Sequence, residues 1–212
     1  MYEVKHFVED RLDVQHDLIE AHPLGLLVCN DGAGRLFANS IPFTIRRDLG
    51  KLGTLRAHLA RANPQWSELK KGMECLTVFQ GEEAYVSPNW YPSKQKHGKV
   101  VPTWNYITVQ VWAEPVVIED PDWLRAQIDE ITNRHESSQP KPWAVGDAPA
   151  EFTSSMIRGI VGVELEIKEI KGKWKVSQNR PQEDIQGVFS GLSNAGKAAI
   201  ADHVAQHLGG DG

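Results

Sequence analysis

The spacing of apolar residues near the start of the chain predicts a helix. Val14, Leu18 and Ala21 fall at positions i, i+4 and i+7, so we expect a helix over about residues 10–20. It has to end before His22, because the proline that follows disfavours helical backbone in the residue before it.

The next apolar run predicts a pair of strands. Residues 24–30 (LGLLVCN) are almost entirely apolar and predict a buried strand, and residues 31–34 (DGAG) predict a hairpin turn. Residues 35–47 then predict a second strand. This strand should be broken or bulged at Pro42, because proline cannot donate a hydrogen bond to a neighbouring strand.

The middle of the chain predicts a helix start and three further strands. Asn63 is suited to cap a helix and Pro64 to occupy its first position. Residues 73–81 and 83–88 predict two strands, and the alternating apolar and polar residues over 104–114 predict a long one.

In the second half of the chain, helices become more frequent. We expect a helix over 120–135, a short one over 149–158 and a helical segment over 182–208. Between them, residues 160–170 alternate as in a strand, and Gly172-Lys173 predicts a turn into a hairpin. Short strands mixed with helices indicate a mainly β, α+β fold: a β-barrel core decorated by helices.

The charge of the chain narrows the choice of partners. A net charge of -5 argues against a chain-wide nucleic-acid surface, and no basic run is longer than two residues. Cys29 and Cys75 lie in apolar runs and are expected to be buried thiols, which suits a reducing cytoplasm. The first ten residues have no signal-peptide pattern, and the run Leu24–Cys29 is too short to cross a membrane. We therefore expect a soluble cytoplasmic protein.

Aromatic and cationic residues gather in the tract 85–106. Trp90 and Trp104 lie there among Lys94 and Lys99. Rings to stack on and charges to hold a phosphate would suit a planar, anionic ligand. The alternative is an aromatic-rich hairpin that packs on itself or on a second subunit.

Two shorter segments are candidates for phosphate or ligand binding. His58, Arg61 and Asn63 lie where a strand meets a helix start, and free N–H groups beside an arginine can hold a phosphate. In the alternative, Asn63 only caps the helix and Arg61 lies on the surface. Gln178 and Arg180 follow a strand in the second segment, where the polar side chains can bind a ligand or simply form a turn.

No sequence signature of a common catalytic or metal site is present. Nucleophile-elbow, zinc-protease, P-loop and dinucleotide-binding motifs are all missing from the sequence. His203 and His207 are four residues apart, but no third ligand is suggested near them. We therefore expect no metal site and assign no catalytic residue.

Seven blocks of the sequence carry a resemblance to a known family. In chain order they are HPLGLLV (22–28), GTLRAHLARANPQW (53–66), VFQGEEAYVSPNWYPSK (78–94), HGKVVPTWNY (97–106), DAP (147–149), IVGVELEI (160–167) and KWKVSQNRP (173–181). Together they resemble the PaiB family, whose members are described as FMN-binding negative transcriptional regulators. The resemblance covers about residues 2–192.

This resemblance implies a split β-barrel and a homodimer that holds FMN between its two subunits. It implies one split-barrel domain with inserted helices over residues 1–192, followed by a C-terminal helix and tail over 193–212. It also implies which residues contact the cofactor. Those along the ring would be Ile41, Pro42 and Phe43, those on the phosphate side His58, Arg61 and Asn63, and those closing the ring side Trp104, Asn105 and Tyr106, with Gln178 and Arg180 from the same or the partner chain.

One position departs from the family pattern. Ser40 stands before Ile41, where relatives usually carry a histidine. A serine can still donate or accept a hydrogen bond, but it cannot stack on a ring or take up a proton near neutral pH. If the histidine of the relatives contacts the flavin, FMN binding is expected to be reduced or lost in this chain.

Three functions remain open from the sequence. The resemblance favours a negative regulator of transcription that binds FMN, although no basic surface shows how DNA would be contacted. The second is a flavin-dependent oxidoreductase of the pyridoxamine-phosphate-oxidase or flavin-reductase type. The third is a flavin-free scaffold for protein contacts.

Overall fold

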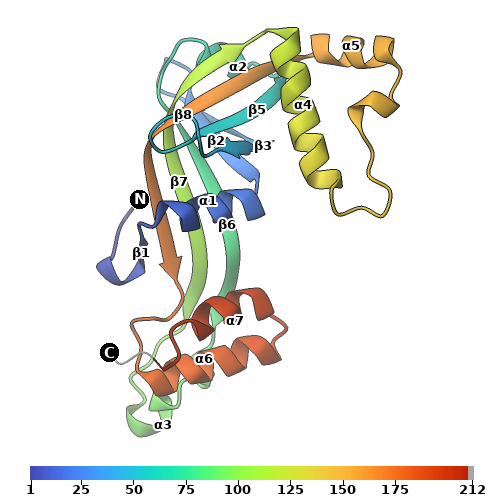
Figure 1. The fold of residues 1–212 in the computed structure, drawn as a ribbon. Coiled ribbons are helices and arrows are strands. Elements are labelled where there is room, and N and C mark those ends of the chain that lie inside the picture. The colour runs from blue at the N-terminus through green and yellow to red at the C-terminus, as the bar shows by residue number, and fades with distance from the viewer. Residues whose placement is uncertain (210–212) are drawn as a thin grey trace. The chain divides into compact units, whose positions relative to one another are not determined.

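A computed structural model describes residues 1–209 of the chain (Figure 1). The last three residues of the expected C-terminal tail lie outside this range. The strands are β1 (Val8–Glu9), β2 (Leu24–Asn30), β3 (Leu36–Pro42), β4 (Thr44–Arg46), β5 (Thr54–Ala60), β6 (Cys75–Val86), β7 (Thr103–Ile118) and β8 (Ile160–Lys175). The α-helices are α1 (Leu12–Ala21), α2 (Gln65–Leu69), α3 (Ser93–His97), α4 (Pro121–Glu136), α5 (Ala150–Arg158), α6 (Gln182–Asn194) and α7 (Ala198–Ala205). Single 3₁₀ turns are η1 (Lys5–Phe7), η2 (Pro88–Trp90) and η3 (Val145–Asp147).

The strands form one sheet in the order β3-β2-β6-β7-β8-β5-β4, with β1 paired to β8. The expected hairpin is confirmed: β2 and β3 are antiparallel, in a register from Leu24 opposite Pro42 to Asn30 opposite Leu36. The strand is interrupted after Pro42, as expected, and resumes at Thr44 as β4. The expected mainly β, α+β class is therefore confirmed.

Two compact units share this sheet. One consists of residues 1–15, 80–109 and 171–212, and the other of residues 16–79 and 110–170. Strands β6, β7 and β8 run from one unit into the other, since each unit boundary near them falls inside a strand. Each unit is described separately below.

The 16–79/110–170 unit has an aliphatic core built from alternate strand positions. Leu27 on β2 and Leu55 on β5 are fully buried, and the residues on either side of Leu27 are at least partly exposed. Phe43, from the break between β3 and β4, meets Phe79 edge to face with ring centroids 5.8 Å apart.

Helix α4 packs on the same unit beside β5 and β8 (Figure 1). Asp120 caps this helix by accepting a hydrogen bond from the Asp122 N–H, as the sequence predicted. Gly162 on β8 allows the close approach, because a Cβ there would lie 2.3 Å from the Trp123 ring. A side chain at position 162 would push the helix off the sheet.

The other unit places β1 against the end of β8 and packs helices α6 and α7 together (Figure 1). Trp90 lies against α6, where a Cβ on Gly191 would come within 2.3 Å of its indole. Tyr91 is buried beside it.

Three expectations about the strands and helices were wrong. The two strands expected over 73–88 are the single strand β6. The hairpin turn expected at Gly172 does not form, and β8 continues through it. Gly172 serves a close approach instead: it pairs with Glu9, whose carbonyl oxygen would lie 2.6 Å from a Cβ at position 172. The helical segment over 182–208 is divided into α6 and α7 at Gly196, whose φ is +70°.

None of the described helices is both long enough and apolar enough to span a membrane.

Candidate functional site

The face of β5 beneath α4 carries a polar cluster. Arg56 on β5 forms an ion pair with Glu164 on β8 (2.6 Å) and lies over the Trp123 ring, 5.6 Å from its centre. His58, two residues along the same face, has its Nδ1 2.7 Å from Oε1 of Gln127 on α4. Alternate residues of a strand share a face, so Arg56 and His58 are presented together.

This cluster leaves buried polar atoms without a hydrogen-bond partner. They are the Thr44 hydroxyl, the Arg56 Nε and the Gln127 Nε2, and Thr44 is paired directly opposite Arg56. Most buried polar atoms in proteins have a partner, so a group of orphaned ones in one place indicates that a water or a ligand completes it.

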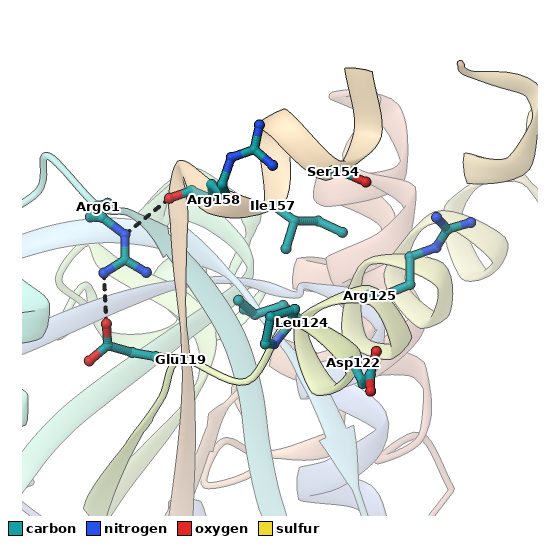
Figure 2. Close-up of a pocket in the computed structure, with 9 residues that line it drawn as sticks. Arg61, Glu119, Asp122, Leu124, Arg125, Ser154, Ile157 and Arg158 are labelled. Atoms are coloured by element: carbon teal, nitrogen blue, oxygen red, sulfur yellow. Dashed lines mark hydrogen bonds and ion pairs between the residues drawn. The ribbon is translucent and has the colours of Figure 1, made fainter. Parts of the chain in front are cut away.

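A pocket of about 660 Å³ lies at the end of β5, the start of α4 and the end of α5 (Figure 2). Its lining combines apolar side chains with three guanidinium groups, two carboxylates and one hydroxyl. The residues are Arg61, Glu119, Pro121, Asp122, Leu124, Arg125, Ser154, Ile157 and Arg158. Volumes of this order are typical of small-molecule sites.

Arg61 is fixed at one side of this pocket by three acceptors, and Figure 2 shows two of them, the Arg158 carbonyl and Glu119. Its guanidinium donates to the carbonyls of Arg158 and Ile160 and, at 2.7 Å, to Glu119. Hydrogen bonds from Arg61 and Lys70 lower the pKa of Glu119. Arg61 therefore ties the end of β5 to the start of β8 and the end of β7, and only part of its donor capacity remains for a ligand.

Arg158 is the freer cation of this pocket. Its side chain is exposed, and within residues 1–209 it forms no ion pair. Arg125, by contrast, donates to Asp129 one turn along α4 at 2.9 Å. The Arg158 guanidinium is therefore the positive charge of this pocket that is available to bind a phosphate. The Ser154 hydroxyl on the same helix could donate a hydrogen bond to the same phosphate.

Asn63 does not line this pocket. Its side-chain oxygen accepts the Gln65 N–H at 3.0 Å, so it caps α2 as the alternative interpretation of the sequence had it. Gln65 is itself fully buried and donates to the Leu27 carbonyl. His58, Arg61 and Asn63 are therefore close in sequence, but each of the three side chains bonds to a different part of the fold.

The segment expected along the flavin ring is mostly core. Ile41 and Phe43 are buried, whereas Pro42 and the preceding Ser40 are exposed. Ser40 lies directly opposite Leu26 on the outer face of the β2–β3 hairpin. Of this segment, only Ser40 and Pro42 are accessible to a ligand in a single chain.

In the 1–15/80–109/171–212 unit, two predicted residues meet at a second pocket. Asn105 and Arg180 line a cavity of about 150 Å³ together with Lys175 and Ser177. Asn105 is fully buried, and its amide exchanges hydrogen bonds with the Ser177 hydroxyl at 3.0 and 3.1 Å. The Arg180 guanidinium lies over the Tyr91 ring, 5.0 Å from its centre.

The remaining predicted residues of this unit have separate environments. Trp104 is 53% exposed and meets Tyr85 edge to face at 6.0 Å. Tyr106 lies 5.6 Å from the Lys173 ammonium. Gln178 is occupied within its own turn, where it accepts from the Val176 N–H and donates to the Trp174 carbonyl.

Two of the three lysines of the aromatic tract have partners of their own. Lys94 donates to Asn89 and Lys96 pairs with Glu183. Trp90 packs on α6 and Tyr91 is buried. Most of this tract is thus part of the fold, and Trp104 and Tyr85 are its accessible aromatic pair.

Several site residues were not predicted from the sequence. Arg56 belongs to the GTLRAHLARANPQW block but was not singled out there. Gln127 and Arg158 have no distinctive neighbours in sequence, and only the packing of α4 and α5 brings them to the site. Lys175 belongs to the KWKVSQNRP block, but alternation along the strand did not distinguish it from Lys173. The orphaned buried atoms are a signal that only a structure provides.

Metal and thiol chemistry find no support in the described residues. No cluster of three or more metal-ligating side chains occurs within residues 1–209. Cys29 and Cys75 are both buried as free thiols, and burial raises the pKa of Cys75 to about 12. Neither thiol has the exposure or the low pKa of a reactive cysteine.

The chain is similar in sequence to a family model and to several known proteins. Residues 1–169 match a family model described as "Putative FMN-binding domain". An uncharacterised protein of Emericella nidulans is 32% identical over 90% of each chain. The Bacillus subtilis "Protease synthase and sporulation protein PAI 2" is 26% identical over 92% of this chain and 90% of its own.

Solved structures share the fold at low sequence identity. The flavocytochrome Anf3 from Azotobacter vinelandii superposes with a TM-score of 0.60 over 82% of this chain and 72% of that one, at 12% identity. An FAD and heme binding protein from Mycobacterium smegmatis gives 0.55 over 79% and 73%, at 16% identity. The predicted split barrel and the resemblance to PaiB proteins are confirmed.

Proposed function

The chain belongs to the FMN-binding domain family that its residues 1–169 match, and from this premise we propose that it binds FMN and acts as a negative regulator of transcription. The regulatory role is the one that the resemblance to PaiB proteins implies. The family and the fold support a flavin cofactor, and the choice of FMN is part of the proposal.

The residues of the larger pocket fit a flavin phosphate. A phosphate needs charge-assisted donors, and here the exposed Arg158 guanidinium, the partly committed Arg61 and the Ser154 hydroxyl supply them. Leu124 and Ile157 provide an apolar wall (Figure 2). The unpaired Arg158 at the edge of a pocket of about 660 Å³ is the observation that carries this assignment. Bound there, FMN would bring a redox-active ring system.

The ring side would be completed by a second copy of the chain. Leu24, Leu26 and Leu36 are 63%, 42% and 67% exposed on the outer face of the β2–β3 hairpin, around Ser40. An apolar sheet face of this kind is typical of a subunit interface. In the proposed homodimer, Pro42 and Ser40 border the ring.

Any contact with DNA would have to come from a small basic patch and not from a broad basic surface. The chain is acidic overall, and basic side chains such as Arg46, Arg47 and Arg61 are paired with carboxylates. Salt-dependent, sequence-selective retardation of a promoter fragment would support direct repression. If no fragment shifts even at low salt, repression through direct DNA contact is excluded.

A flavin-dependent oxidoreductase is the second candidate. The smaller pocket at Lys175 favours it, because a polar cavity of about 150 Å³ suits a small substrate group better than a whole cofactor. Oxidation of NAD(P)H by the flavin-loaded protein would support the enzyme.

The visible spectrum of the purified protein tests flavin binding itself. A flavin absorption band, or uptake of added FMN, is expected for both candidates. A colourless protein that takes up no FMN would leave the scaffold role.

A further inference from the structure

Three basic side chains gather without an acidic partner around the end of β8. Lys173, Lys175 and Arg180 form no ion pair with any described residue. Lys173 donates to the Tyr2 carbonyl and lies 5.5 Å from the Tyr2 ring. The cluster is positively charged although the whole chain has a net charge of -5.

The pocket between Lys175 and Arg180 is lined by donors and contains no carboxylate. Thr103, Asn105, Ser177 and Asn179 supply the rest of its polar surface. Its volume of about 150 Å³ is well below the range of about 300–1,000 Å³ typical of sites for whole drug-sized ligands. It is therefore suited to a compact charged group.

Lys175 is held in place at this pocket. Its ammonium donates to the Thr103 hydroxyl at 2.5 Å and to the Trp104 carbonyl, and it lies 5.9 Å from the Phe7 ring. These two hydrogen bonds leave one of its three N–H donors uncommitted. Burial lowers the pKa of Lys175, and the positive charges of Arg180 and Lys173 lower it further. A bound anion would relieve this repulsion.

The turn that carries Arg180 is held by hydrogen bonds. Ser177 has a φ of +69°, the only positive value for a residue other than glycine among the described residues. Its hydroxyl is fixed by the fully buried Asn105, and the Arg180 N–H donates to the Ser177 carbonyl at 3.0 Å. Strained backbone of this kind persists only where the surroundings enforce it, and it is concentrated at functional sites.

We propose that this pocket binds a compact oxyanion, a phosphate or a carboxylate group of a small ligand, between Lys175 and Arg180. A guanidinium fork and an ammonium that line the same pocket match the shape and charge of such a group. The resemblance implies that Asn105 and Arg180 lie near a flavin ring, but Lys175 is not among the residues it implies, and no residue of this pocket lines the Arg158 pocket proposed for the flavin phosphate. The anion site is therefore distinct from the proposed phosphate site.

Anion titration of the full chain tests the proposal. Inorganic phosphate and acetate are titrated separately by calorimetry at constant ionic strength, and melting temperatures are recorded in parallel. We expect saturable binding of at least one anion, weakened about tenfold or more in Lys175→Gln and Arg180→Gln, the size of one lost charge-assisted contact. Tighter binding of phosphate assigns a phosphate-bearing ligand, and tighter binding of acetate assigns a carboxylic acid.

Two variants serve as controls. Arg35→Gln, an exposed residue in the β2–β3 turn, should bind the anion as the wild type does. Arg158→Gln should bind FMN about tenfold more weakly and keep the anion, so that failure of the flavin site and of this site can be told apart. No saturable binding of either anion would overturn the proposal, as would undiminished binding in folded Lys175→Gln and Arg180→Gln. If Arg180→Gln does not fold, Arg180→Lys replaces it, because this variant keeps the charge and loses only the two-pronged contact of the guanidinium.

Discussion

His58 on β5 and Gln127 on α4 are joined by a contact of 2.7 Å between Nδ1 and Oε1. This contact orients the imidazole on the sheet face where Arg56 and Thr44 also leave buried atoms without partners. We expect Gln127→Leu to lower the free energy of unfolding by about 1 kcal/mol, because the lost hydrogen bond is partly offset by removal of the orphaned Nε2. Urea unfolding measures it.

If His58 contacts the cofactor, the same variant should also weaken FMN binding, since its imidazole is no longer oriented. Gln139→Leu, at an exposed position after α4, is the matched control and should change neither quantity. Full FMN affinity in Gln127→Leu would remove His58 from the cofactor site.

Arg61→Ala should affect stability as well as binding. The substitution removes the hydrogen bonds to the Arg158 and Ile160 carbonyls and to Glu119. Because the side chain is 40% exposed, we expect a loss of about 1–2 kcal/mol in the free energy of unfolding. Thermal melting without FMN checks this. An unchanged melting temperature would show that Arg61 is not the tie between β5, β7 and β8 described above.

Arg158→Gln should separate binding from stability. Arg158 forms no ion pair within residues 1–209, so its loss should leave the melting temperature of the FMN-free protein unchanged. FMN affinity should fall about tenfold, as expected for one charge-assisted contact of about 1.5–3 kcal/mol. Fluorescence titration of FMN measures it, with Arg35→Gln as control. Equal affinities in the two variants would place the phosphate elsewhere.

His16 should make the protein less stable in mild acid. Burial lowers its pKa below the ordinary value of 6.5 and outweighs the hydrogen bond to the Leu52 carbonyl, which raises it. The unfolded chain therefore takes up a proton at a higher pH than the folded one, and stability is lost as the pH falls from about 6.5 through the folded pKa. His207, whose pKa is also lowered by burial, adds to this trend.

Melting temperatures between pH 7.5 and about 5 test this dependence. His16→Gln keeps a neutral donor at this position and should reduce the slope, whereas the exposed His6→Gln should not. The same slope in His16→Gln and wild type would contradict the assignment.

Leu26→Glu should disrupt the proposed homodimer. Leu26 is 42% exposed at the centre of the outer hairpin face, opposite Ser40 and Val78. A carboxylate there would face its counterpart or apolar surface in the partner, which strongly disfavours association. Light scattering should give a dimer mass for the wild type and a monomer mass for the variant. A monomeric wild type would contradict the shared-site model.

The sequence predicted those parts of the fold that local rules decide. The β2–β3 hairpin follows from its DGAG turn, the break after Pro42 from the chemistry of proline, and the start of α4 from Asp120. Gly172 was mistaken for a turn because its role, admitting the Glu9 backbone, depends on a strand more than 160 residues away. The pairing of β1 with β8, and not the local sequence, determines the role of Gly172.

The candidate site was predictable only in part. Arg61, Asn105 and Arg180 do line pockets, as expected of ligand-binding residues, but Asn63 caps a helix and Phe43 lies in the core. Position within a motif does not reveal which way a side chain faces. Arg158 and Gln127 reach the site through helices that pack on the sheet, and no spacing in the sequence reveals such packing.

Equilibrium dialysis of FMN against the purified wild-type chain, read by flavin absorbance, tests the central claim most directly. The account predicts saturable, stoichiometric retention of FMN with a visible flavin band, reduced in Arg158→Gln. A folded protein that retains no FMN at any concentration, or one whose retention is untouched by Arg158→Gln and Arg61→Ala together, would contradict it.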